Sequence, residues 1–103
     1  MRTARLSPEA AAELHEAAAW YKERAPEVAR RFLAEVRTLA RKVARMPSRF
    51  PILRNPEMDP PVRRALVAGF PDALIFVDTG EVIHVVAVAH QHRAPGYWLQ
   101  RVR

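Results

Sequence analysis

Cysteine is absent from the 103 residues, and glycine occurs only three times. The lack of cysteine excludes a disulfide scaffold, a cysteine-ligated zinc site and a thiol nucleophile, and it is typical of a reducing compartment. So few glycines argue against a glycine-rich loop that cradles phosphate. No apolar run reaches the roughly 18 residues that a membrane helix needs, so we expect a cytoplasmic protein.

Positive charge exceeds negative charge, and arginine carries almost all of it. Basic residues number 17 against 11 acidic ones, a net charge of +6, and only Lys22 and Lys42 are lysines. Arginine forms flat, bidentate contacts with phosphates and carboxylates. The composition therefore predicts a polyanionic partner, either a nucleic acid or an acidic protein, although codon bias toward arginine would give the same composition.

Two helices are predicted in the first half of the chain. The first begins at Ser7-Pro8-Glu9, where serine suits the N-cap, proline the first helical position and glutamate the first turn. The second follows Pro26, stops at Pro47 and carries apolar residues at intervals of three or four: Val28, Phe32, Val36, Leu39, Val43 and Met46. Because about two residues join the helices, we expect an antiparallel hairpin.

Strands are predicted at both ends of this hairpin. Residues 2–6 form a short alternating stretch, and residues 62–68, 73–78 and 82–89 have strand patterns, the middle one apolar on both faces and hence central. Residues 47–61, with five prolines, read as a connecting loop. At the last hairpin we expect a four-residue loop that pairs Val77 with Val82, because a two-residue loop would place Asp78 opposite Glu81.

These elements predict an α+β fold of order β-α-α-β-β-β. The N-terminal helical hairpin packs on one face of a mainly antiparallel four-stranded sheet, which the first strand joins. The other face remains as a candidate binding surface. The composition, half apolar and 27% charged, is typical of a folded chain, and we expect residues 1–103 to form a single domain.

Several local patterns, in this order along nearly the whole chain, resemble the RelE/ParE superfamily of type II toxin–antitoxin toxins. They are Glu13-Leu14, Ala19-Trp20-Tyr21, Phe32-Leu33-Ala34-Glu35-Val36, Pro47-Ser48-Arg49-Phe50-Pro51, Arg64-Ala65-Leu66-Val67, Phe70-Pro71, Ala87-Val88-Ala89-His90, Arg93 and Pro95-Gly96-Tyr97-Trp98.

The resemblance implies a bacterial toxin that stops growth when it is free of a cognate antitoxin. RelE-like members are ribosome-dependent mRNA endoribonucleases, whereas ParE-like members poison DNA gyrase and need no nuclease residues. We expect a ParE-like gyrase inhibitor, with the RelE-like nuclease as the alternative. We expect the antitoxin to present a helix or strand to an apolar edge and a carboxylate to arginines. The antitoxin normally supplies the DNA-binding part, so we expect no sequence-specific DNA binding by this chain alone.

Four residues would carry the chemistry if the chain were a metal-independent endoribonuclease: His90, Arg93, Tyr97 and Arg64. RNA cleavage needs a base, an acid and a cation for the phosphorane charge. His90 suits the acid–base role, Arg93 the phosphate and Tyr97 stacking or proton donation. Strand alternation lets only one of Arg63 and Arg64 face the open side, and the family pattern favours Arg64. The alternative is that the residues after the last strand only pack the C-terminal segment onto the sheet.

Other features carry less chemistry. His90-Gln91-His92 lacks a third ligand nearby, so we expect neither a metal nor another cofactor. RelE-like lysines are missing, because no lysine follows Lys42. Trp20 is expected to be exposed and Tyr21 to pack inward with Leu14. The basic face of the second helix is either a solvated surface or a contact for phosphates or an acidic antitoxin.

Overall fold

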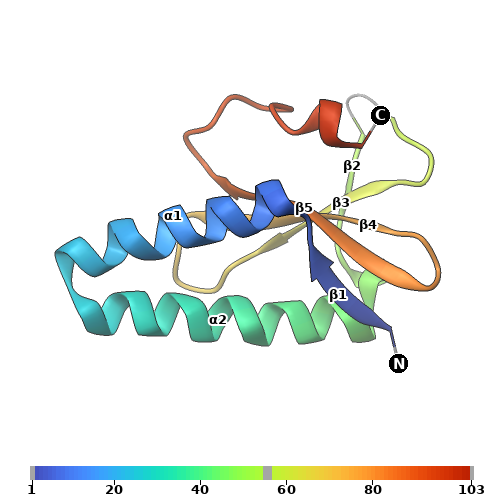
Figure 1. The fold of residues 1–103 in the computed structure, drawn as a ribbon. Coiled ribbons are helices and arrows are strands. Elements are labelled where there is room, and N and C mark those ends of the chain that lie inside the picture. Colours follow the sequence, from blue (N-terminus) through green and yellow to red (C-terminus); the bar gives the residue numbers. More distant parts are fainter. Residues whose placement is uncertain (1, 55–56, 103) are drawn as a thin grey trace.

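The computed structural model describes residues 2–54 and 57–102. Within these ranges, five strands and two long helices make up the fold (Figure 1). In chain order the elements are β1 (Thr3–Leu6), α1 (Pro8–Arg24), α2 (Pro26–Arg45), a 3₁₀ turn (Pro47–Arg49), β2 (Ile52–Leu53), β3 (Val62–Leu66), β4 (Asp72–Asp78), β5 (Val82–His90) and a second 3₁₀ turn (Leu99–Arg101).

The helical hairpin forms where the sequence predicts it. The Ser7 hydroxyl accepts a hydrogen bond from the Ala10 amide at 3.1 Å, so it caps the N-terminus of α1. Extended Ala25 ends α1, and Pro26 begins α2 immediately afterwards. Neither helix in the described ranges is both long and apolar enough to span a membrane.

The sheet has five strands in the order β1-β5-β4-β3-β2, so the prediction of four strands is wrong. β1 runs parallel to β5, the other neighbours are antiparallel, and β4 is central as predicted. The additional strand is β2, which lies in the segment predicted as loop and pairs Ile52 with Arg63 and Leu53 with Val62. A two-residue edge strand can lie between prolines, because proline is tolerated at sheet edges. Pro56, one of the prolines counted in that loop, lies outside the described residues.

The register of the last hairpin also differs from the prediction. Val77 pairs with His84, not with Val82, and Asp78 pairs with Ile83. The turn is tight, because the Thr79 amide donates to the Val82 carbonyl at 3.1 Å and Gly80 adopts a φ of 95°. In this register Asp78 lies opposite Ile83, so the two carboxylates of Asp78 and Glu81 are not paired across the hairpin.

Strand β3 ends two residues earlier than predicted. The Val67 amide already donates to the Asp72 carbonyl at 2.9 Å, within the turn that leads to β4. Strands β4 and β5 match their predicted ranges to within one residue at each end. A bulge shifts the β4–β5 register, because Ile75 pairs with Ala87 while Phe76 pairs with Val85.

Each face of the sheet has its own apolar core. Helix residues such as Phe32, Val36 and Val43 pack with Leu74 and Phe76 on one face. On the other face, Trp98 of the C-terminal segment packs with residues of β3, β4 and β5, namely Val62, Ile75, Val77, Val86 and Ala87. The segment after β5 turns back over this face, opposite the helices (Figure 1). The second face is therefore partly covered, whereas the sequence predicted an open surface.

Candidate functional site

A groove of about 980 Å³ remains where the C-terminal segment does not cover the sheet. Residues of β3 and β4 line it together with the chain that follows β5. The four predicted site residues all reach this groove: Arg64, His90, Arg93 and Tyr97. The fold thus brings together residues that lie up to 33 positions apart in the sequence.

Strand alternation separates Arg64 from Arg63, as the sequence predicts. Arg64 is exposed and lines the groove. Arg63 lies on the opposite side of β3, where its guanidinium donates to the Phe50 carbonyl at 2.7 Å. Arg64 therefore offers its charge to a ligand in the groove, while Arg63 fixes the chain that leads into β2.

A carboxylate outside the predicted set of site residues lies behind the groove. Glu13 of α1 is turned toward β5, and its side chain is only 11% exposed. One oxygen accepts from the Val88 amide at 3.0 Å and from Arg101 at 2.8 Å, and the other accepts from Arg101 at 3.2 Å. Arg101 also donates to the Val86 carbonyl at 2.9 Å. We call Glu13, Arg101 and these two backbone groups the Glu13 latch.

The Glu13 latch provides hydrogen-bond partners for backbone groups at the edge of β5, beyond the point where β1 ends. β1 ends at Leu6 opposite Val85, so the Val86 carbonyl and the Val88 amide find their partners in side chains. Burial alone would raise the pKa of Glu13, but the hydrogen bonds from Arg101 and from the Val88 amide outweigh it and hold the pKa below 4.5. The carboxylate is therefore ionised at neutral pH and ties the C-terminal segment to α1.

Tyr97 lies next to the Glu13 latch, between Arg93 and Arg101 of the C-terminal segment. Its ring lies under Arg93, whose guanidinium carbon is 3.9 Å from the ring centre, and Arg101 lies 5.1 Å away. Its hydroxyl is buried and has no hydrogen-bond partner of good geometry among the described residues. Burial and then the Glu13 carboxylate raise the pKa of Tyr97 to about 12, so the phenol stays protonated at neutral pH.

Two histidines stack at the end of β5. The His90 and His92 rings are 5.0 Å apart and inclined by 27°. The His92 amide donates to Nδ1 of His90 at 3.1 Å, so a neutral His90 carries its proton on Nε2. His90 also pairs with Asp72 across the β4–β5 ladder.

Asp72 begins a second connection between α1 and the sheet. The residue is 3% exposed, and its carboxylate accepts a hydrogen bond of 2.6 Å from the Tyr21 hydroxyl. Burial and this carboxylate raise the pKa of Tyr21 above its usual range. Trp20, by contrast, is 51% exposed, with the Arg24 guanidinium 3.3 Å from its ring centre. The prediction that Trp20 is the exposed aromatic residue and Tyr21 the packed one is confirmed.

Metal ligands do not gather at the groove. Over residues 2–54 and 57–102, no group of three or more His, Asp or Glu side chains is placed to hold an ion. The polar side chains that line the groove include three arginines, His90, Gln91 and Tyr97, with no carboxylate among the described lining residues, an arrangement that suits anionic ligands.

A sequence model of a known family matches most of the chain. The family is described as the ParE toxin of the type II toxin–antitoxin system parDE, and the match covers residues 4–95. The chain belongs to the ParE toxin family. It is therefore the toxin of a type II toxin–antitoxin module, with an antitoxin as its partner. No curated protein matches the chain.

A solved structure shares the fold of this ParE-family toxin. It is described as a chromosomal ParDE TA system from P. aeruginosa, with a TM-score of 0.71 and 20% sequence identity. The alignment covers 87% of this chain and 96% of the other. At this level of identity the likeness concerns the fold alone.

Sequence reasoning missed the Glu13 latch for two reasons. Glu13 is part of a pattern that carries the family resemblance, but one acidic residue on a helix does not indicate where its charge is neutralised. Arg101 lies 88 residues away, beyond the part that the ParE family model matches. The available signal was the buried face of α1, where a glutamate beside Leu14 requires a cationic partner.

Proposed function

We propose that this ParE-family toxin stops growth by binding DNA gyrase, in the manner of ParE-like toxins, and not by cleaving RNA. The observation that carries the proposal is the buried hydroxyl of Tyr97, which lies against Glu13 and not in the groove. An inhibitor that acts by binding needs no acid–base pair at the groove. Because gyrase acts on chromosomal DNA, the proposal also assigns the toxin to the cytoplasm.

The contacts of the other candidate residues support a binding function. Arg93 stacks on the Tyr97 ring and lies 3.9 Å from Glu13, so part of its charge is already balanced. His90 uses Nδ1 to hold its own turn. General acid–base cleavage needs two groups that both reach the reacting phosphate. Arg64 and Nε2 of His90 are left for that task, which is a poor set for such a reaction.

The test is to induce the chain without its antitoxin and to pulse-label DNA and protein synthesis. We expect DNA synthesis to fall first, with DNA breaks, and the purified toxin to inhibit supercoiling by gyrase. His90→Ala and Tyr97→Phe should remain toxic, provided that circular dichroism shows both variants to be folded. The proposal fails if protein synthesis falls first, or if folded His90→Ala loses its toxicity.

We propose further that the antitoxin neutralises the toxin by occupying the groove. Its lining within the described residues contains arginines and apolar side chains but no aspartate or glutamate. Leu66 at the groove is 67% exposed, an unusual position for a leucine that has no partner. Apolar surface flanked by cations fits an acidic, amphipathic antitoxin segment.

Co-purification of the antitoxin with toxin variants tests this docking site. Leu66→Glu removes the apolar contact and opposes acidic groups, so we expect it to release the antitoxin. Arg64→Glu should weaken the complex by repulsion. Lys22→Glu changes the charge of an exposed α1 residue away from the groove and is the matched control. Full retention of the antitoxin by Leu66→Glu would exclude the groove as the docking site.

A further inference from the structure

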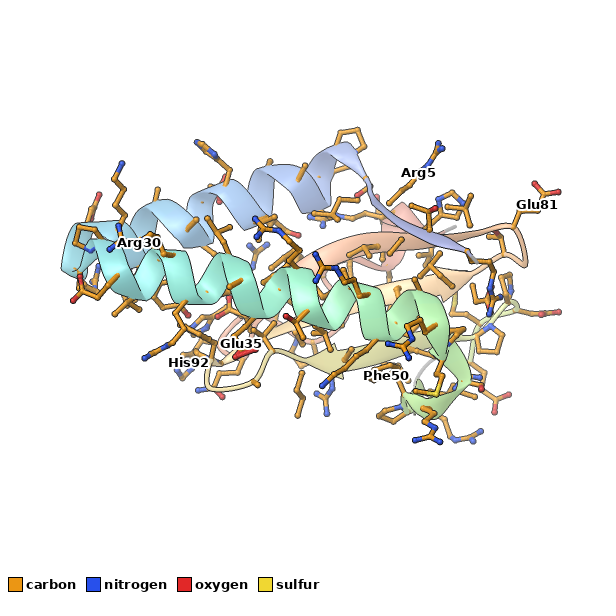
Figure 2. All side chains as sticks on the ribbon, turned by 90° about the horizontal axis from the view of Figure 1, so that it is seen from below. Arg5, Arg30, Glu35, Phe50, Glu81 and His92 are labelled. Atoms are coloured by element: carbon orange, nitrogen blue, oxygen red, sulfur yellow. The ribbon has the colours of Figure 1, made fainter. Side chains whose placement is uncertain are left out.

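The outer face of α2 carries most of the excess charge of the molecule. Six basic residues and two acidic ones give this helix a net charge of +4, out of +6 for the whole chain. Arg30, Arg37, Arg41 and Arg45 lie on one side of the helix, opposite its buried residues. We call these four residues the α2 arginine stripe. Figure 2 looks onto this side of the molecule, with Arg30 labelled near the start of α2.

The α2 arginine stripe is not neutralised within the protein. All four side chains belong to exposed residues, and none forms an ion pair with another described residue. The two acids of the helix, Glu27 and Glu35, are not paired with it in the described part of the chain either. The helix therefore presents its positive charge to solvent or to a partner.

The composition of the surface around the α2 arginine stripe favours a nucleic acid over a protein as its partner. Protein interfaces rely on a few large apolar or aromatic anchors at their centre. The exposed large apolar residues in the described ranges are Trp20, Met46 and Leu66, and none of them lies on α2. The side chains between the arginines are small, such as Ala34 and Thr38. The face thus lacks the anchors that would hold an antitoxin helix.

The same features favour a duplex over a single strand. Binding of single strands depends on aromatic side chains that stack on bases, and α2 exposes none. Residues 30–45 span about 22 Å of straight helix, over which a DNA duplex presents about 13 phosphates. Four arginines in a row can contact several of these phosphates without reading a base.

We infer that the α2 arginine stripe binds the phosphate backbone of double-stranded DNA without sequence specificity. This function is separate from the groove, and it does not depend on gyrase being the target. A toxin that holds DNA directly would be concentrated where proteins that act on DNA work. It does not conflict with the expectation that the chain alone reads no DNA sequence, because backbone contacts carry no sequence information.

Fluorescence anisotropy with a labelled 24-base-pair duplex of arbitrary sequence tests the inference on the full chain, freed of its antitoxin. We expect micromolar binding at low salt, unchanged when the duplex sequence is scrambled. The logarithm of the binding constant should fall with the logarithm of salt with a slope of about −3.6, which corresponds to four phosphate contacts. An absence of binding at low salt would overturn the inference.

A pair of charge-matched variants locates the surface. Arg37→Glu/Arg41→Glu should weaken binding at least about tenfold and make the salt slope shallower by about 2. The control Lys22→Glu/Arg5→Glu changes the net charge equally at exposed residues outside both α2 and the groove, and we expect a change of less than about threefold. Equal losses in both variants would overturn the assignment to α2. If the glutamate variant does not fold, Arg37→Gln/Arg41→Gln provides the same comparison with half the charge change.

Competition identifies the ligand class. Unlabelled duplex DNA should displace the labelled duplex better than single-stranded DNA of equal length. Stronger displacement by single-stranded DNA or by duplex RNA would show that DNA duplex is the wrong ligand. Loss of antitoxin binding by Arg37→Glu/Arg41→Glu with unchanged DNA binding would assign the α2 arginine stripe to the antitoxin instead.

Discussion

The two helices of the hairpin use their charges in opposite ways. α1 carries four acidic residues against two basic ones, and it turns one of its glutamates inward to bind Arg101 of the C-terminal segment. α2 buries a row of apolar side chains that includes Phe32, Val36 and Val43, and it turns its arginines to solvent. A charge on α1 thus contributes to the fold, whereas the charges on α2 are free for a partner.

Burial, not residue type, decides what a charged side chain of this hairpin does. Glu13 is mostly buried and accepts from three donors, so its removal would leave the Val88 amide without a partner and Arg101 without its carboxylate. Arg41 is exposed and has no acidic partner in the described part of the chain. Substitutions in the two helices therefore test whether burial separates these roles.

The apolar face of α2 is expected to dominate stability. Phe32 is fully buried, and its ring lies 4.8 Å from Tyr21 and 5.1 Å from Phe70. Phe32→Ala should lower the free energy of unfolding by about 3–5 kcal/mol, because it removes buried apolar surface and leaves a cavity. Urea denaturation followed by circular dichroism measures the change. Thr38→Ala, on the exposed side of the same helix, is the control and should change little.

The Glu13 latch is expected to come next. Glu13→Gln should cost about 2–3 kcal/mol at neutral pH, because an amide cannot accept both hydrogen bonds from Arg101 and adds a donor that faces a cation. Since the pKa of Glu13 is lower in the folded than in the unfolded chain, its stabilisation is complete above pH 4.5. The stabilisation is lost as the pH falls below that value.

Denaturation curves at several pH values separate this effect from a general loss of packing. The difference between wild type and Glu13→Gln should be constant from about pH 6 to 8 and should shrink below pH 4.5. Glu16→Gln, an exposed glutamate on the same helix, is the matched control. A difference that stayed the same down to pH 3 would contradict the role of the ionised carboxylate.

The link between Tyr21 and Asp72 is expected to have a smaller effect. Tyr21→Phe keeps the ring among its aromatic neighbours but removes the hydroxyl that donates to the buried carboxylate. We expect a loss of about 1–3 kcal/mol, the cost of leaving a buried acceptor without its partner. Thermal unfolding of Tyr21→Phe, of Asp72→Asn and of the double variant Tyr21→Phe/Asp72→Asn measures the coupling. Additive losses would show that the two groups do not interact.

The local parts of the fold were predictable from sequence. Ser7-Pro8-Glu9 and the apolar spacing of α2 fix both helices, because capping and helical periodicity depend on neighbouring residues. β2 was not predictable, since two residues between prolines carry no alternation. The register of the last hairpin also failed, because the local hydrogen bonds of Thr79 and Asp78 stabilise a tighter turn than charge repulsion suggests.

The site was predictable only in part. Alternation placed Arg64 at the groove, and the segment after β5 brought His90, Arg93 and Tyr97 to the same place. The burial of the Tyr97 hydroxyl and its closeness to Glu13 depend on how the C-terminal segment folds back across the sheet. Contacts between residues more than 80 positions apart produce no periodic pattern in a single sequence.

The smallest effect on stability is expected on the outer face of α2. Arg37→Ala/Arg41→Ala removes two charges that have no ion-pair partner among the described residues, and alanine has the highest helix propensity. The free energy of unfolding should therefore change by less than about 0.5 kcal/mol, measured by urea denaturation beside Glu13→Gln. A loss as large as that of Glu13→Gln would remove the contrast between the helices, because the arginines would then contribute to the fold. Unchanged stability together with weaker DNA binding would instead separate the two roles of charge within one hairpin.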